Sequence, residues 1–173
     1  QDNAFIGYQT GGLNQTGYSN VFMGNQAGYN NDDGANNVFL GNKAGFSSTS
    51  PWSNVIIGNE AGFSITDGYS NVFIGSSSGY SNTWGYDNVY IGNTAGEKNK
   101  TGYDNVCIGV ASGGKTTSSS DNVLIGYGTG YDNTTGNSNV FLGTQAGWGN
   151  TTGTNNVFLG SQTGYANKVG NGN

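Results

Sequence analysis

The stretch Asn37 to Phe46 reads Asn-Val-Phe-Leu-Gly-Asn-Lys-Ala-Gly-Phe, and Asn54 to Phe63 repeats it as Asn-Val-Ile-Ile-Gly-Asn-Glu-Ala-Gly-Phe. The phrase recurs every 17 residues without a slip. A fixed period of this length is typical of stacked coils, in which each copy buries its apolar side only against its neighbours. We therefore expect residues 1–173 to form one repeat domain. The ten copies begin at Asn3, Asn20, Asn37, Asn54, Asn71, Asn88, Asn105, Asn122, Asn139 and Asn156.

Counting positions 1 to 17 from the Asn of each copy, positions 2 to 4 form the apolar core of the repeat. Position 2 is Val in nine copies, with Ala4 as the exception, and position 4 is Ile, Leu or Met in all ten. Side chains two residues apart lie on the same side of a strand, so we expect positions 2 and 4 to point together into the coil. Position 3, which is mostly Phe, then points outward.

Glycine punctuates each copy at positions 5 and 9, which predicts corners that need positive φ or a close approach of two backbones. We expect a turn and a short second strand there, followed by a polar outer loop over positions 11 to 17. No window has the 3.6-residue spacing of an amphipathic helix. The sequence therefore predicts an all-β fold, a parallel β-solenoid of ten coils, about 48 Å long if successive strands lie 4.8 Å apart.

The Asn at position 1 is expected to form a structural ladder, because stacked side-chain amides can donate to and accept from one another. Ten equal copies indicate a structural task for this residue rather than catalysis or metal binding. The predicted ladder comprises Asn20, Asn37, Asn54, Asn71, Asn88, Asn105, Asn122, Asn139 and Asn156.

If position 3 faces outward, its side chains form a continuous apolar stripe, which soluble monomers rarely leave uncovered. Either the outer loop folds over the stripe or other chains cover it, and we favour other chains because strands with two apolar faces are normally buried on both. The repeats also run at full strength to both ends, which predicts an excerpt of a longer array or a unit that stacks end to end. The predicted self-assembly stripe is Phe22, Phe39, Ile56, Phe73, Tyr90, Phe141 and Phe158.

The phrase at Asn37 to Phe46, together with Thr-Thr-Gly-Thr-Asn-Asn-Val-Phe-Leu-Gly at Thr151 to Gly160, resembles the head repeats of trimeric autotransporter adhesins. It is also similar to β-roll repeats of tail-fibre proteins. The resemblance implies a left-handed roll, a trimer and a place on a cell surface or virion. The copies depart from adhesin heads in two respects: the coil is longer, and large aromatic residues stand at position 3.

The composition excludes several functions. The chain has no His, no Arg and a net charge of −5, which argues against nucleic-acid binding and against catalysis by the commonest general base. We expect no enzyme activity and no cofactor. No stretch is apolar for long enough to insert into a membrane. Abundant Gly, Asn, Ser, Thr and Tyr with few charges is typical of extracellular repeat proteins.

Two kinds of candidate site remain in the polar positions. Asp87, Asp104 and Asp121 occupy one column and are weak candidates to share a calcium ion, although a solvated turn is the preferred interpretation. Asn-x-Ser/Thr sequons at position 12 are candidate glycosylation sites on the expected outer loop. These sequons are Asn14, Asn99, Asn133 and Asn150.

Three hypotheses for function follow. The first is a structural extracellular fibre or adhesin-type rod that assembles with copies of itself. The second is a glycan-binding or receptor-attachment module that uses the aromatic columns at positions 10 and 16, whose other interpretation is packing between coils. The third is ice binding through the Thr column at position 13, from Thr49 to Thr151.

Overall fold

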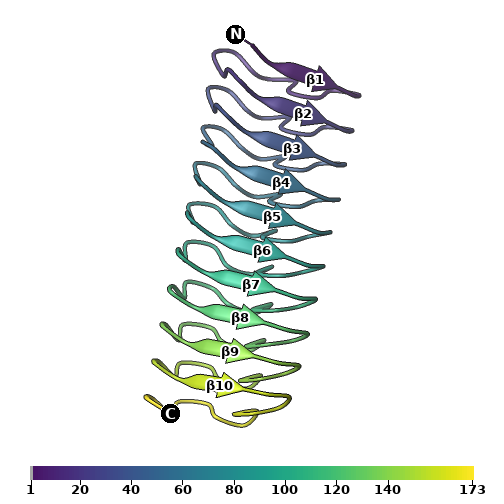
Figure 1. The fold of residues 1–173 in the computed structure, drawn as a ribbon. Helices are drawn as coiled ribbons and strands as arrows, with labels where there is room; N and C mark the ends of the chain where they lie inside the picture. Colours follow the sequence, from purple (N-terminus) through teal and green to yellow (C-terminus); the bar gives the residue numbers. More distant parts are fainter. Residues whose placement is uncertain (1) are drawn as a thin grey trace.

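The computed structural model describes residues 2–173 and shows ten short strands, each of three residues, in one parallel sheet. No helix occurs in this range. Figure 1 shows the strands stacked one below another from β1 to β10, with all arrows pointing the same way. The strands are β1 (Ala4–Ile6), β2 (Val21–Met23), β3 (Val38–Leu40), β4 (Val55–Ile57), β5 (Val72–Ile74), β6 (Val89–Ile91), β7 (Val106–Ile108), β8 (Val123–Ile125), β9 (Val140–Leu142) and β10 (Val157–Leu159).

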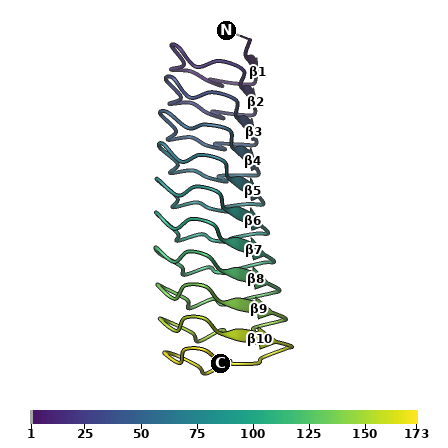
Figure 2. The ribbon, with the colours of Figure 1, turned by 60° about the vertical axis from the view of Figure 1, so that its left-hand side comes forward.

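Each coil contributes one strand, and the pairing keeps the sequence period. Val55 pairs with Val72, and Val72 pairs with Val89. In Figure 2 the turns and loops of every coil extend to the side away from the strands and stack in the same way. The predicted all-β parallel solenoid of 17-residue coils is confirmed.

The predicted second strand is absent. Positions 6 to 11 form turns, and successive coils are joined there by hydrogen bonds such as those from the Gly28 N–H to the Ala44 carbonyl and from the Gly45 N–H to the Ala61 carbonyl. The glycine at position 9 has φ near +58°, as at Gly28 and Gly45. Such left-handed conformations break the extended backbone that a second strand would need.

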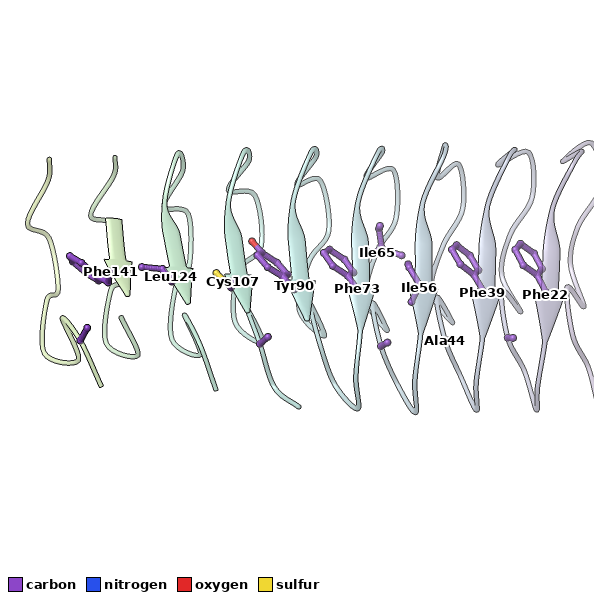
Figure 3. Packing of buried hydrophobic residues seen from close by; sticks show 14 residues of the cluster. Phe22, Phe39, Ala44, Ile56, Ile65, Phe73, Tyr90, Cys107, Leu124 and Phe141 are labelled. Atoms are coloured by element: carbon purple, nitrogen blue, oxygen red, sulfur yellow. The ribbon is translucent and has the colours of Figure 1, made fainter. Parts of the chain in front are cut away.

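The predicted orientation of the strand is wrong. Position 3 points into the coil, and positions 2 and 4 point outward. The whole predicted self-assembly stripe lies inside or partly inside the solenoid: Phe22, Phe39, Ile56, Phe73, Tyr90 and Phe141 are fully buried and Phe158 is half-buried. Figure 3 shows the fully buried members, from Phe22 to Phe141, in a single file along the stack of strands.

The space inside one coil explains this orientation. The ring of Phe39 lies against Gly45, where an added Cβ would come within 2.6 Å of Phe39 Cε2. The same clash recurs between Phe22 and Gly28. The interior of a 17-residue coil therefore accepts one large side chain from the strand only because position 9 has no side chain of its own.

The remaining interior positions adjust to that side chain. Ala44 and its equivalents at position 8 fill the small space on the turn side. Where the coil of Asn54 carries the smaller Ile56 in place of Phe, Ile65 replaces the usual polar residue at position 12 and is fully buried. In this coil the volume lost at position 3 is thus recovered at position 12, as in a well-packed core.

The predicted Asn ladder is confirmed. The N–H and the Nδ2 of Asn37 both donate to Asn20 Oδ1, at 3.0 and 3.1 Å, and Asn37 Nδ2 also donates to the Pro51 carbonyl at 2.7 Å. The same three bonds recur at Asn54 and in every later coil through Asn156. A buried polar side chain is stable here because its donors and its acceptor are all paired.

Candidate functional surfaces

No pocket is found in residues 2–173. Since a small-molecule site is usually concave, function has to be sought on the long faces of the rod. Three such faces carry regular columns: the strand side, the side of positions 10 and 11, and the side of positions 16 and 17.

The strand side carries two parallel columns of aliphatic residues from positions 2 and 4, which we call the aliphatic strand face. These side chains are partly exposed in the middle of the rod and more exposed toward its ends, where the exposed fraction runs from 38% at Val140 to 60% at Leu159. No member of either column is charged. The face consists of Ala4, Val21, Val38, Val55, Val72, Val89, Val106, Val123, Val140 and Val157, with Ile6, Met23, Leu40, Ile57, Ile74, Ile91, Ile108, Ile125, Leu142 and Leu159.

The size of this face can be worked from strand geometry. Ten strands about 4.8 Å apart give a length of about 43 Å, and two columns ~7 Å apart give a width of roughly 12 Å once side chains are included. The product is roughly 500 Å², at the upper end of what a monomer leaves exposed in one patch. Sequence reasoning missed this face, although the glycine at position 9, opposite position 3, was a signal for it.

The predicted aromatic columns are present, but their rings stack on one another. At position 10, Tyr29, Phe46, Phe63 and Tyr80 form a continuous stack with centroids 5.0 to 5.5 Å apart. A sugar ring packs against the face of an aromatic ring, and within a stack both faces are already covered by neighbours. The geometry therefore favours packing between coils at these positions.

The stack at position 16 behaves in the same way. Tyr69, Tyr86 and Tyr103 lie 4.8 and 4.9 Å apart, with ring planes within 5° of parallel. Desolvation by its surroundings, followed by the repulsion of Tyr69 and Tyr103, raises the pKa of Tyr86. Within this stack, too, the facing ring surfaces are covered by neighbouring rings.

The hydroxyls of the Thr column at position 13 donate hydrogen bonds to backbone carbonyls. The Thr66 hydroxyl donates to the Thr83 carbonyl at 3.0 Å, and Thr117 and Thr134 make the equivalent bond in their coils at 3.0 and 2.9 Å. A hydroxyl that donates within the protein cannot donate the same proton to an ordered water layer. These bonds give the column a structural task at the outer corner of each coil.

The predicted calcium ligands do not come together as a metal site. Asp87, Asp104 and Asp121 are exposed at the corner before the Asn ladder and have φ between +52° and +61°. Among the described residues no group of three or more His, Cys, Asp or Glu side chains could hold a metal ion. Asp tolerates this left-handed backbone conformation better than most residues, so the turn explains the column.

Three of the four sequons predicted as glycosylation sites lie inside the solenoid and not on the outer loop where we expected them. Asn99, Asn133 and Asn150 are fully buried, and Asn14 is half-buried. Position 12 faces the coil interior rather than the outer loop: Asn133 Nδ2 donates to the Gly136 carbonyl at 2.9 Å, and Asn150 Nδ2 donates to Asn133 Oδ1 at 3.0 Å. A sugar on these nitrogens would occupy the space of the core.

Charged groups form only local contacts in the part of the chain that the structure describes. Its two ion pairs join Lys98 to Glu97 at 2.6 Å and Lys115 to Asp132 at 2.8 Å. The hydrogen bond that each ammonium donates to its carboxylate partner raises the pKa of Lys98 and of Lys115. Within residues 2–173 there is also no helix that could span a membrane.

Cys107 stands inside the solenoid between Tyr90 and Leu124 and is 1% exposed. Burial raises the pKa of its thiol to about 12. A thiol that remains protonated and enclosed is a poor nucleophile, so it acts as a small core residue.

Comparison of the chain with protein-family models, with curated proteins and with solved structures gives no match.

Proposed function

We propose that this chain is a structural rod that assembles side by side with further copies of itself through the aliphatic strand face. The observation that carries the proposal is the pair of uncharged aliphatic columns that run the length of the sheet, partly exposed in the middle strands and exposed toward both ends. All-parallel sheets are found almost only with both faces covered. Here the coil interior covers one face, and a partner is needed for the other.

A second copy fits this face better than an unrelated protein does. Knobs and holes along the face repeat once per coil, as the register Val55 to Val72 to Val89 shows. Only a surface with the same spacing of about 4.8 Å can interdigitate with it over all ten strands. Another copy of the chain has the same spacing because its coils are identical.

The energetics support association of this kind. If roughly 500 Å² is covered on each copy, about 1,000 Å² leaves water in all, and at ~25 cal/mol per Å² the gain is at most about 25 kcal/mol. The entropic cost of association takes about 4 to 15 kcal/mol of this, and desolvation and side-chain ordering take more. A total of about 1,000 Å² lies below the size typical of stable complexes, so we expect assembly to be reversible for a single pair of rods and stronger where each rod is covered by more than one neighbour.

Rigidity is the product of such an assembly. The continuous backbone bonds between coils and the buried Asn ladder resist local opening, because each coil is held on both sides. We place the rod outside the cell, on a surface or a virion, on the strength of its composition and of its resemblance to adhesin-head and tail-fibre repeats. A trimer is the arrangement that this resemblance implies.

The test is the mass of the particle in solution. We expect sedimentation velocity to show an oligomer of the unmodified chain that dissociates on dilution. Ile57→Lys combined with Ile91→Lys should give monomers with an unchanged circular dichroism spectrum, because both side chains point outward. The matched control, Ser64→Lys with Ser81→Lys, adds the same charges at position 11 and should leave the oligomer intact. A chain that is monomeric at every concentration, or a lysine variant that still assembles, would refute the proposal.

A further inference from the structure

Stacked aromatic rings join almost every pair of successive coils. The rings come from the columns at positions 3, 10 and 16, and seven of the nine junctions between coils contain at least one stacked pair. One pair for each of these junctions, in chain order, is Phe5–Phe22, Phe22–Phe39, Phe46–Phe63, Phe63–Tyr80, Phe73–Tyr90, Tyr131–Trp148 and Phe141–Phe158.

The two exceptions lie on either side of the coil that runs from Asn105 to Asp121. This coil carries Cys107 at position 3, Gly114 at position 10 and Ser120 at position 16, so it has no ring in any of the three columns. Its backbone is otherwise regular, because β7 pairs in register with both β6 and β8. All three aromatic columns are therefore interrupted at the same level of the rod.

The downstream junction of this coil has compensating contacts. Lys115 forms an ion pair with Asp132 at 2.8 Å, and its ammonium lies 4.9 Å from the centre of the Tyr131 ring. The Thr117 hydroxyl also donates to the Thr134 carbonyl at 3.0 Å. These contacts replace part of the missing stacking.

The upstream junction lacks the equivalents. Position 13 is Lys100 there, which has no hydroxyl to donate to the Thr117 carbonyl, so the Thr column is interrupted as well. What remains is the backbone pairing, the ladder bonds from the Asn105 N–H and Nδ2 to Asn88 Oδ1, at 3.1 and 3.0 Å, the bond from the Tyr103 N–H to Ser120 Oγ at 3.1 Å and a long bond from Asn99 Nδ2 to the Ser119 carbonyl at 3.5 Å. This junction therefore has no stacked ring pair, no ion pair and no threonine bond.

We propose that the rod has a built-in point of opening between Asp104 and Asn105, so that residues 3–104 and 105–172 behave as two cooperative units. In a linear array the stability is a sum of coil terms and junction terms, and opening concentrates at the weakest junction. One absent stacked pair changes the equilibrium for opening by about two- to tenfold. Opening here exposes the edges of β6 and β7 while the other coils stay folded.

The property belongs to the single rod and does not depend on assembly. Under load or heating, the rod yields at one defined place instead of unravelling from its ends. The opened edges of β6 and β7 can pair again with each other, because their register is set by the neighbouring folded coils. A yielding point of this kind makes extension reversible.

The single cysteine of the chain reports on this junction directly. Cys107 is enclosed in the closed rod and becomes accessible when β7 separates from β6. We would measure its reaction with 5,5′-dithiobis(2-nitrobenzoate) in increasing concentrations of urea below the unfolding transition. The slope with urea should be much shallower than that of global unfolding, because local opening exposes less surface.

A matched pair of variants tests the physical cause. Lys100→Thr should restore the bond from position 13 to the Thr117 carbonyl, as Thr83 bonds the Lys100 carbonyl at 3.0 Å, and should slow the labelling of Cys107 by about fivefold. The control, Lys168→Thr, makes the same change at position 13 of the last coil, where no further coil follows in residues 2–173. It should leave the labelling rate unchanged. Equal rates for the two variants would overturn the proposal.

Hydrogen exchange of the unmodified protein gives a second readout that needs no variant. The Val89 and Gly109 N–H groups donate across the junction, to the Asn105 and Ile91 carbonyls. They should exchange at a lower urea concentration than the Val38 N–H, which donates to the Asn54 carbonyl in an aromatic-rich part of the rod. Uniform exchange along the rod, or labelling of Cys107 only with the full urea dependence of global unfolding, would also overturn the proposal.

Discussion

The Asn ladder can be tested by removing one member from the middle of the rod. Asn71→Ala deletes the acceptor for the Asn88 N–H, at 3.1 Å, and the donor to the Gly85 carbonyl, at 2.8 Å. Neither the Asn88 N–H nor the Gly85 carbonyl has another partner in the described residues. Asn54 Oδ1 keeps the bond from the backbone N–H of residue 71, and Asn88 Nδ2 keeps the Gly102 carbonyl.

The expected cost follows from these two orphaned groups. A buried donor or acceptor left without a partner costs about 1 to 3 kcal/mol, so Asn71→Ala should lower the free energy of unfolding by about 4 kcal/mol. The matched control is Asn59→Ala. Asn59 also belongs to an Asn pair, accepting from Asn42 Nδ2 at 2.9 Å, but that pair is exposed and its loss should cost less than ~0.5 kcal/mol.

Equilibrium unfolding in urea, followed by circular dichroism, measures both variants at a concentration where the chain is monomeric. If the buried ladder stabilises the rod, Asn71→Ala must lower the free energy of unfolding by clearly more than Asn59→Ala does. If Asn71→Ala and Asn59→Ala destabilise the rod by the same amount within experimental error, the buried amides are not what holds the corner of the coil.

Three further predictions concern the coil interior. Phe39→Ala should lower the free energy of unfolding in urea by about 3 to 5 kcal/mol, whereas Leu40→Ala, measured on the monomer, should lower it by only about 1 kcal/mol. A larger effect of Leu40→Ala would contradict the observation that position 3 points inward and position 4 outward. Burial raises the pKa of Cys107 in the folded chain to about 12 from an ordinary 9.0, so above pH 9 only the unfolded thiol ionises and the free energy of unfolding falls. The free energy of unfolding of Cys107→Val should therefore rise relative to that of the unmodified chain between pH 8 and pH 10.5. A difference between the two proteins that does not change with pH would contradict this. Asn82→Ser should lower the free energy of unfolding by roughly 1 kcal/mol less than Asn133→Ser does, as measured by thermal unfolding. Both polar side-chain atoms of Asn82 lack partners, whereas Asn133 donates to the Gly136 carbonyl. Equal effects of the two substitutions would contradict this.

Much of the fold could be predicted because repetition removes ambiguity. The 17-residue period requires parallel strands in register, and the uninterrupted Asn at position 1 requires a ladder that satisfies its own amides. Gly58, with φ of +141° and no room for a Cβ beside the Gly75 carbonyl, shows why position 5 is always glycine. Each of these inferences rests on a local requirement of one coil that recurs in every coil along the rod.

The candidate surfaces could not be predicted so well. The polar neighbours of the sequons predict an outer loop for position 12, yet this position faces the interior of the coil, as the bond from Asn99 Nδ2 to the Tyr90 hydroxyl at 2.8 Å shows. The Thr column suggests an exposed surface, but its hydroxyls donate to backbone carbonyls of the next coil. Polarity alone does not tell an exposed side chain from a buried one with partners.

The sequence by itself determined the period, the parallel register and the file of Asn side chains, because each is a relation between a residue and its own copy 17 positions away. Alternation along a strand also established that Val72 and Ile74 share one side and Phe73 takes the other. Only the tertiary structure decided which side is the inside. That choice depends on how much volume a closed coil encloses, and one aromatic ring packed against the glycine at position 9 fills it, which leaves the aliphatic pair facing outward.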